Sequence, residues 1–334
     1  MHEPGQMKNK RRLAFSLFSG VGGLDLGFEQ AGFTIAAAVE LNKVHAQTYS
    51  KNFDNPVLCQ SVTDTTRSHL YKAAGLPSRT DIDVVFGGPP CQSFSLAGHR
   101  NPADVRSRLL FEFLRVVGEV RPKFFVLENV KGLTMGACAD VLKEAITVAR
   151  SAGYECTPWQ VLNAKHYGVA QSRERLFLLG SRCDMPLVQY PGRHAGGVTC
   201  GDVLSDIPEW ATGQTITQHS EKVVVRFAAT LQGEREPISR FNRLHPAGVS
   251  PTLRAGTHQT KSSKGGRHTA VRPIHPTEPR CCTVRELARL HGYPDSFEFA
   301  ATICDGAMQI GNSVPPPLAK AMAEMVRKAI ALSH

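Results

Sequence analysis

The sequence of 334 residues contains no apolar run of the roughly 18–20 residues that a membrane-spanning helix needs. Its N-terminal segment, MHEPGQMKNKRR, is polar and basic and lacks the apolar stretch of a secretory signal. We therefore expect a protein without membrane contact that works in the cytoplasm.

Paired cysteine motifs are also missing. The nine cysteines are odd in number and irregularly spaced, and no CxxC pair occurs among them. This usage argues against a disulfide framework and against a structural zinc site, and it fits a reducing compartment. We expect no bound metal.

Acidic residues are in the minority. The chain has 29 Asp and Glu against 39 Lys and Arg, a formal net charge of +10. Such a balance favours polyanionic partners such as nucleic acid, although charge alone does not identify one.

Short apolar runs alternate with amphipathic stretches through the first half of the chain. Strands are predicted at 13–18, 35–39, 82–86, 124–127 and 176–179, and a helix at 105–120. This alternation is typical of an α/β fold with a mostly parallel sheet and helices on both faces. Ligands bind such sheets at the carboxyl ends of the strands.

The composition changes after about residue 186. Residues 187–284 are rich in Gly, Pro, Ser, Thr and Arg and show few helical patterns, and residues 239–280 hold eight Lys or Arg and one acid, Glu278. A helical pattern returns at 283–297, and a last amphipathic helix is predicted from about Pro317. The length also suggests two domains, or one with a large insertion.

A glycine-rich turn, Phe18-Ser19-Gly20-Val21-Gly22-Gly23-Leu24, follows the first predicted strand. Glu40 ends the next strand, 20 residues after Gly20. Glycines let a backbone approach a ligand, and a carboxylate at this spacing can accept hydrogen bonds from both hydroxyls of a ribose. The turn lacks full GxGxxG spacing, so a dinucleotide, S-adenosylmethionine and a turn without a ligand all remain open at this point.

Two chemically active side chains also follow predicted strands. Cys91 comes after Gly88-Pro89-Pro90, where the two prolines restrict the backbone, and Glu128 ends the strand 124–127. Both should face the same edge of the sheet. A reactive thiol needs nearby positive charge, for which Arg173 and Arg175 are candidates.

Together these motifs resemble the C5-cytosine DNA methyltransferase family over nearly the whole chain. The similar segments are FSLFSGVGGLDLGFEQAGF, GGPPCQSFSLAGHR, FVLENVKGL, QSRERLFLLG, RELARLHGYPDSF and QIGNSVPPPLAKAM, in the family's order. The resemblance implies an S-adenosylmethionine-dependent methyltransferase fold for residues 1–186. It also implies a smaller, irregular, β-rich target-recognition domain with hinge at 187–300, and a returning segment at 301–334.

The resemblance also assigns roles. Cys91 would be the nucleophile, Glu128 would contact the base, and Arg175, with Arg173 nearby, would hold both in place. Bound S-adenosylmethionine would contact Phe18, Gly20, Gly22, Gly23, Leu24, Glu40, Leu41, Ser61, Val62, Asp64, Pro90, Asn312, Ser313 and Val314. The family usually has an acid near the adenine amine, whereas this chain reads Ser61-Val62-Thr63-Asp64, so either Ser61 replaces that acid or Asp64 reaches the adenine.

Double-stranded DNA is the expected partner, and the target cytosine must leave the helix stack to be reached. The candidate DNA contacts are Gln92, Ser93, Ser95, Arg100, Arg240, Arg243, Thr252, Arg254, Lys261, Lys264, Arg267 and Arg272. The resemblance further implies a monomer of the bacterial restriction-modification or solitary type, with a cognate restriction endonuclease as an optional partner.

Three alternatives stay open on the sequence alone. An RNA cytosine methyltransferase would carry the same motifs, but the Cys-Phe-Thr signature of a tRNA-acting branch is absent here. A non-catalytic DNA-binding relative would not need Cys91, Glu128 and Arg175. A nicotinamide-dependent oxidoreductase is the third.

Overall fold

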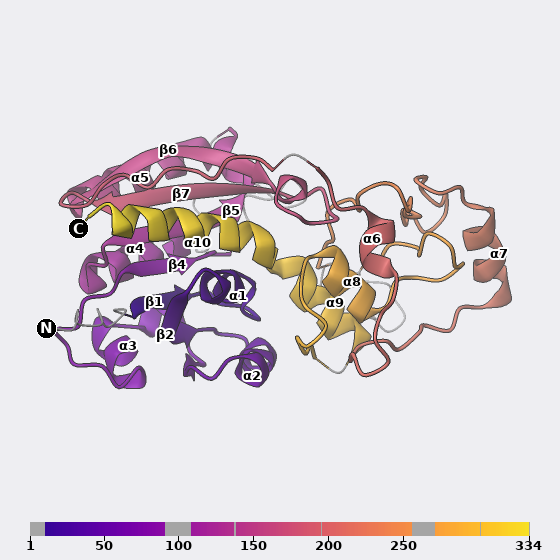
Figure 1. Ribbon diagram of the computed structural model, residues 1–334, viewed down its shortest axis with the longest axis horizontal. Helices are drawn as coiled ribbons and strands as arrows, with labels where there is room; N and C mark the ends of the chain where they lie inside the picture. The colour runs from indigo at the N-terminus through magenta and orange to yellow at the C-terminus, as the bar shows by residue number, and fades with distance from the viewer. Residues whose placement is uncertain are drawn as a thin grey trace, which may run out of the picture.

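The protein has two parts that differ in regularity, a sheet covered by helices and a largely irregular region (Figure 1). A computed structural model describes most of the chain, namely residues 11–90, 108–136, 138–194, 196–255, 271–300 and 302–333. Among these residues, no helix is both long and apolar enough to span a bilayer.

A seven-stranded sheet forms the centre of the larger part. Its strands are β1 (Arg12–Leu17), β2 (Phe33–Val39), β3 (Val57–Leu58), β4 (Val84–Gly87), β5 (Phe124–Val130), β6 (Tyr154–Asn163) and β7 (Glu174–Arg182). The order across the sheet is β3-β2-β1-β4-β5-β7-β6. Strands β3 to β5 in this order pair in parallel, whereas β7 is antiparallel to both of its neighbours. The strand order reverses between β1 and β4, and ligands bind open α/β sheets at such a switch point.

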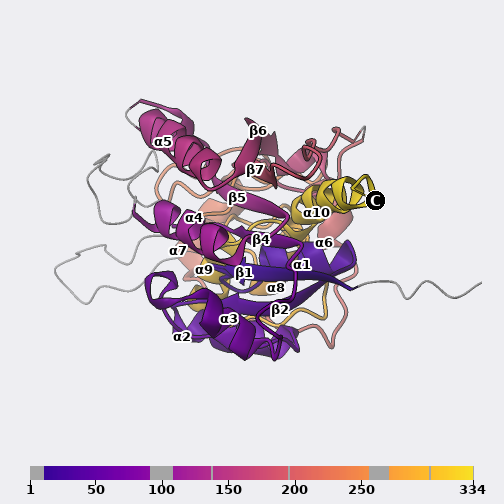
Figure 2. The same cartoon turned by 90° about the vertical axis from the view of Figure 1, so that its left-hand side faces the viewer.

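Helices cover both faces of this sheet (Figure 2). One apolar core lies between the sheet and helices α3 (Arg67–Ala73), α4 (Arg108–Val120) and α5 (Cys138–Ser151). A second core lies on the opposite face, under α1 (Gly23–Gln30) and α10 (Pro316–Ala331). The parallel strands are thus buried on both faces, which explains their nearly continuous apolar sequences.

The C-terminal helix returns to the beginning of the chain. A Cβ atom added at Gly27 would lie 2.4 Å from the Cβ atom of Ala319 and 2.5 Å from the backbone nitrogen of Lys320. Glycine therefore lets α1 and α10 approach as closely as they do. Pro316, at the first position of α10, has no N–H that the helix would leave unpaired.

The predicted strands at 13–18, 35–39, 82–86, 124–127 and 176–179 are all present, with bounds that differ by up to a few residues. Strand β6 and helix α5 were not predicted. Half of β6 faces solvent, and its register shifts between Thr157 and Gln160, so its sequence carries no clean alternation. Pairing with β7, rather than a local sequence pattern, defines this edge strand.

The remaining helices are α2 (Lys43–Asn52), α6 (Cys200–Leu204), α7 (Glu221–Ala229), α8 (Val284–Leu290) and α9 (Ile303–Asn312), with 3-10 turns η1 (Val62–Asp64), η2 (Lys131–Thr134) and η3 (Ala164–His166). Three of these helices, α6 to α8, lie in the region 187–300. The β-rich character predicted for that region is not found among its described residues, which form only isolated bridges.

In this region, arginine side chains rather than paired strands bind backbone carbonyls. The guanidinium of Arg243 donates to the backbone carbonyls that end α7, those of Phe227, Ala228 and Thr230, at 2.9–3.0 Å. Arg285 does the same for the carbonyl of Phe297, at 2.7 Å. Buried carbonyls must be paired, and here long side chains pair them without regular backbone structure.

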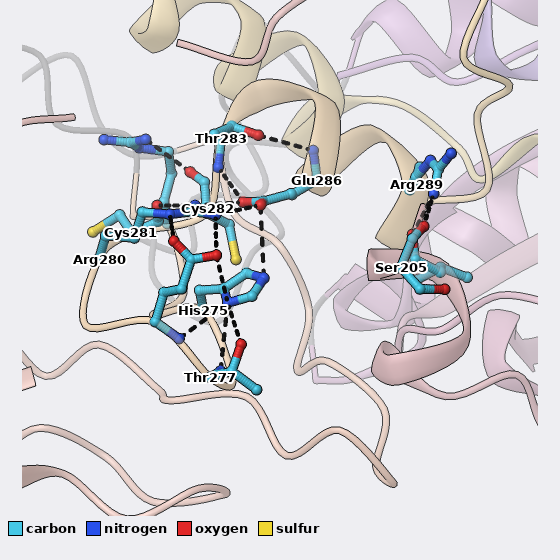
Figure 3. Close-up of polar contacts among 12 residues, drawn as sticks. Ser205, His275, Thr277, Arg280, Cys281, Cys282, Thr283, Glu286 and Arg289 are labelled. Atoms are coloured by element: carbon cyan, nitrogen blue, oxygen red, sulfur yellow. Dashed lines mark hydrogen bonds and ion pairs between the residues drawn. The ribbon is translucent and has the colours of Figure 1, made fainter. Parts of the chain in front are cut away.

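A charged cluster fixes the chain that precedes α8 (Figure 3). Arg280 donates from Nη1 and Nη2 to the two carboxylate oxygens of Glu286, at 2.9 and 2.7 Å, and from Nε to Glu278 at 2.7 Å. Glu286 also accepts from the backbone N–H of Thr283 at 2.7 Å, which completes a capping box. His275 Nε2 lies 3.7 Å from the same carboxylate. The carboxylate of Glu286 therefore anchors both the helix start and the segment before it.

Candidate active site

A cavity opens at the carboxyl ends of β1, β4 and β5, where the strand order reverses. It holds about 400 Å³ of space that no protein atom fills, including space that is open to solvent. The lining residues come from the turn after β1, from α2, from the ends of β4 and β5, and from the C-terminal segment; they are Phe18, Ser19, Gly20, Val21, Gly23, Leu24, His45, Gly88, Glu128, Gln309, Asn312, Ser313 and Val314.

The turn after β1 presents its backbone to the cavity. Phe18 and Gly20 both have positive φ, 54° and 59°. A bulky residue such as Phe rarely adopts this conformation, and backbone strain of this kind is concentrated at functional sites. A Cβ atom at Gly20 would meet no atom within 4 Å, so the space in front of this turn is free for a ligand.

Glu40 connects this turn to the end of β2. One carboxylate oxygen accepts from the backbone N–H of Gly20 at 2.8 Å and the other accepts from that of Asn42 at 2.7 Å. Each oxygen keeps a second lone pair that could accept from a ribose hydroxyl. His45, in α2, lies with Nδ1 3.9 Å from the same carboxylate, and burial lowers the pKa of His45 although Glu40 opposes the shift.

Glu128 and Arg175 form an ion pair at the inner end of the cavity. Arg175 lies opposite Val130 in the β5–β7 ladder, so its side chain shares a face with that of Glu128 two residues earlier. The Nε of Arg175 lies 2.8 Å from Oε1 of Glu128, and both side chains are largely buried. Burial raises the pKa of Glu128, and the charges of Arg175 and Arg173 oppose that shift. The carboxyl group can therefore hold a proton more readily than an exposed glutamate does.

The turn that leads to position 91 is attached to this pair. A Cβ atom at Gly88 would lie 2.6 Å from Oε2 of Glu128, so only glycine allows the carboxyl group this position. The buried side chain of Asn129 donates from Nδ2 to the carbonyl of Pro89 at 3.2 Å. The residues before Cys91 are thus held against the end of β5.

The C-terminal segment closes the opposite wall. Asn312, Ser313 and Val314 line the cavity, as predicted for residues that contact the cofactor. A Cβ atom at Gly23 would lie 2.3 Å from the carbonyl oxygen of Val314 and 2.7 Å from the hydroxyl of Tyr293. Gly23 therefore allows the first helix and the last segment to meet beside the cavity.

Arg173 is buried next to this wall. Its guanidinium donates to the carbonyls of Leu253, Gly311 and Ser313 at 2.7–2.9 Å. These bonds link three segments that are distant in the sequence. The role predicted for Arg173, near Arg175, stays a prediction.

The residues predicted to hold the adenine end of the cofactor do not line the cavity itself. Leu41 is 69 % exposed directly after Glu40. Val62 is buried, Ser61 caps η1 with its hydroxyl, and Asp64 is exposed. Whether Ser61 or Asp64 reaches the adenine stays open.

The predicted DNA contacts divide into two groups. Arg240, whose φ is 64°, and Arg254 are exposed. Thr252 is exposed as well, and its hydroxyl donates to the carbonyl of Ser172 at 2.7 Å. Arg243 and Arg272, both partly buried, donate to protein carbonyls, Arg272 to that of Cys282 at 2.8 Å. The nucleophile Cys91 and the candidates Gln92, Ser93, Ser95, Arg100, Lys261, Lys264 and Arg267 lie outside the described residues.

Outside the glycine-rich turn and the turn before Cys91, sequence reasoning missed three residues of the site. His45 and Gln309 line the cavity, and Asn129 holds Pro89. Asn129 belongs to the Glu-Asn-Val motif, which could have drawn attention to it. His45 lies in a helix that was not predicted, and Gln309 pairs with Thr48, 261 residues away, which no local pattern reveals.

These residues suit a ligand with an adenosine and an amino-acid group. The open backbone at Gly20 can approach a charged end, Glu40 offers acceptors, and Phe18 and Val314 supply apolar surface. Within the described part of the chain, no group of three or more His, Cys, Asp or Glu residues could hold a metal ion.

Solved structures share this architecture. A crystal structure of a protein described as a DNA modification methyltransferase encoded within an E. coli prophage has a TM-score of 0.83 and 29 % identity, and the match covers 96 % of this chain and 99 % of that one. The S. pombe Dnmt2 methyltransferase matches with a TM-score of 0.68 at 18 % identity, over 96 % and 99 % of the two chains, which shows the fold alone. The fold is thus that of the S-adenosylmethionine-dependent DNA methyltransferases, and the predicted α/β class is confirmed.

Sequence comparison identifies the family of DNA methyltransferases to which the chain belongs. The profile of the C-5 cytosine-specific DNA methylase family matches residues 14–328. The Type II methyltransferase M.XorII of Xanthomonas oryzae pv. oryzae is 43 % identical, over 96 % of this chain and 85 % of its own. The Type II methyltransferase M.FnuDI of Fusobacterium nucleatum is 32 % identical, over 94 % of each. The chain belongs to the C-5 cytosine-specific DNA methylase family, as its motifs indicated.

Proposed function

We propose that the protein methylates C5 of a cytosine flipped out of a specific duplex DNA sequence, through a covalent bond between Cys91 and C6 of the base. The observation that carries this proposal is the position of Glu128. Its buried carboxyl group, paired with Arg175, borders the cavity formed by the glycine-rich turn. The same carboxyl group touches Gly88, three residues before Cys91.

The proposed reaction gives Cys91 and Glu128 separate roles. The thiolate of Cys91 adds to C6, and the electron pair displaced from the C5–C6 double bond makes C5 nucleophilic. Glu128 donates a proton or a strong hydrogen bond to N3, which stabilises the adduct, and its raised pKa favours that role. Once C5 has taken the methyl group, it loses its proton to water or another base, N3 returns to Glu128 any proton that it received, and the C6–sulfur bond breaks to release the thiolate.

The walls of the cavity would hold S-adenosylmethionine, which supplies the methyl group when bound. Glu40 would accept hydrogen bonds from the ribose, and the backbone of Gly20 would lie against the amino-acid end. Ser313 and Val314 would cover the ligand from the C-terminal side, and Pro90 would lie between cofactor and base.

We also propose that Arg240 and Arg254, both exposed, contact DNA. Arg243 and Arg272 would act on DNA indirectly, since their guanidiniums already bind backbone carbonyls. The names of the bacterial relatives support a restriction-modification setting in the cytoplasm, with a cognate endonuclease as partner. We propose a monomer.

Trapping with 5-fluorocytosine tests the covalent step, because fluorine cannot leave C5 as a proton. Bisulfite sequencing of DNA from cells that express the protein first gives the target sequence. A duplex of that sequence with 5-fluorocytosine at the target should then form an adduct that survives denaturation when S-adenosylmethionine is present. Cys91→Ala should form none, and Cys183→Ala, which removes an exposed thiol elsewhere, should form it normally.

Two results would reject the proposal. A Cys91→Ala protein that still methylates DNA would exclude the thiol from the reaction. Methyl transfer to tRNA, with none to duplex DNA, would assign a different substrate to the same site.

A further inference from the structure

Three buried polar side chains lie between the cofactor cavity and the irregular region. We call Gln171, Arg173 and His291 the polar relay. They come from the segment before β7 and from the residue that follows α8, and none is more than 1 % exposed. Their hydrogen bonds reach Ser313 on one side and Leu253 on the other.

On the side of the irregular region, the relay holds both backbone polar groups of one residue. The backbone N–H of Leu253 donates to Oε1 of Gln171 at 3.1 Å, and the carbonyl of Leu253 accepts from Nη1 of Arg173 at 2.9 Å. The neighbouring hydroxyl of Thr252 donates to the carbonyl of Ser172 at 2.7 Å. The Thr252-Leu253 pair is therefore fixed to the segment that leads into β7, the strand that carries Arg175.

On the side of the cavity, the relay holds the wall. The carbonyl of Ser313 accepts from Nη2 of Arg173 at 2.9 Å and lies 3.1 Å from Nε2 of His291. Arg173 also donates to the carbonyl of Gly311 at 2.7 Å. Ser313 lines the same cavity as Glu128.

The relay has one consistent arrangement of protons. Because a carbonyl only accepts, Nε2 of His291 must carry the proton that faces Ser313. Nδ1 of His291 then accepts from Nε2 of Gln171 at 2.9 Å, since Oε1 of Gln171 already accepts from Leu253. Gln171 and His291 thus satisfy each other, whereas Arg173 shares Leu253 with Gln171 and Ser313 with His291. The loss of one member leaves buried polar groups unpaired.

We propose that the polar relay is a positioning device that couples filling of the cofactor cavity to DNA binding at the Thr252-Leu253 pair. A ligand that contacts Ser313 restricts the motion of that wall, and the hydrogen bonds of the relay restrict Leu253 in turn. DNA then binds a segment that is already ordered, so its binding no longer includes the entropic cost of ordering that segment. By reciprocity, DNA must strengthen cofactor binding by the same factor. The inference rests on the proposed function, because it requires Thr252-Leu253 to be near DNA.

The test measures this factor directly. Anisotropy of a fluorescent duplex that carries the target sequence gives the Kd for DNA with and without saturating S-adenosylhomocysteine. The wild-type ratio should be about 5–150, the usual range of coupling between sites. His291→Leu removes both hydrogen bonds at a similar side-chain volume and should bring the ratio close to one. His291→Gln keeps a donor and an acceptor and should restore much of it.

His275→Leu is the matched control. His275 is also a buried histidine that accepts backbone hydrogen bonds, but it lies in the Arg280 cluster and contacts neither Leu253 nor Ser313. This variant should keep the wild-type ratio even if its stability falls. Arg173→Lys gives a second test if His291→Leu does not fold, because one ammonium group cannot span the three carbonyls.

The outcomes separate the inference from the function on which it rests. A wild-type enzyme that methylates DNA but shows a ratio of one overturns the relay alone. So does a wild-type ratio in both His291→Leu and Arg173→Lys, or an equal loss in His275→Leu. A wild-type protein that methylates no duplex DNA overturns the proposed function instead.

Discussion

The contact between Gly23 and the C-terminal segment gives a sharp quantitative prediction. In Gly23→Ala the new Cβ atom would stand 2.3 Å from the carbonyl oxygen of Val314, whereas ordinary contacts begin at 3.4 Å. The wall that carries Val314 must then retreat by about 1 Å, and overpacking of this kind costs about 1–3 kcal/mol. Because the wall also lines the cavity, the affinity for S-adenosylhomocysteine should fall at least about 10-fold, or ~1.4 kcal/mol.

The control is Gly118→Ala, in the last turn of α4. A Cβ atom there meets nothing within 4 Å, so the change should stabilise the helix by about 0.5–1 kcal/mol. Chemical denaturation should therefore separate the two variants by roughly 1.5–4 kcal/mol, and calorimetric titration should give weaker ligand binding in Gly23→Ala alone. Equal stability and equal affinity in the two variants would refute the close-packing argument.

Three further predictions concern buried polar groups. Burial raises the pKa of Asp25 from 3.8 to about 7. The free energy of unfolding that the neutral carboxyl group contributes is therefore fully present below about pH 4 and is lost as the pH rises through 7. Asp25→Asn should flatten that loss in denaturation curves taken across this pH range. Arg280→Met should cost about 3–5 kcal/mol in chemical denaturation, because it leaves the carboxylate of Glu286 buried without its main partner, and a cost below about 1 kcal/mol would contradict the cluster. Asn129→Ala frees the carbonyl of Pro89 and should lower the single-turnover rate about 10-fold or more while DNA affinity stays unchanged; an unaltered rate would mean that this bond does not position the turn.

The sequence predicted those parts of the site that follow from strand ends. Gly20, Glu40 and Glu128 each follow or end an apolar run, and parallel strands bring their carboxyl ends to one edge of a sheet. Periodicity and turn residues carry this information within a few neighbouring positions. The motif for the C-terminal wall was identified by its resemblance to a family, since no local pattern places Ser313 beside Glu128.

The irregular region was predicted less well, for a physical reason. Its backbone groups are paired by side chains from distant positions, as when Arg173 binds Leu253, 80 residues away. Such pairs leave no period in the sequence. Arg243 shows the same limit. The basic composition around it predicted a DNA contact, whereas its guanidinium donates to backbone carbonyls at the end of α7.

The closing of the cavity by residues from both ends of the described chain has a consequence for synthesis. The glycine-rich turn and Glu128 leave the ribosome well before Gln309 to Val314 and the helix behind them. A nascent chain therefore carries Glu128 long before its cavity is complete, and the cavity can close only after Val314 has been made.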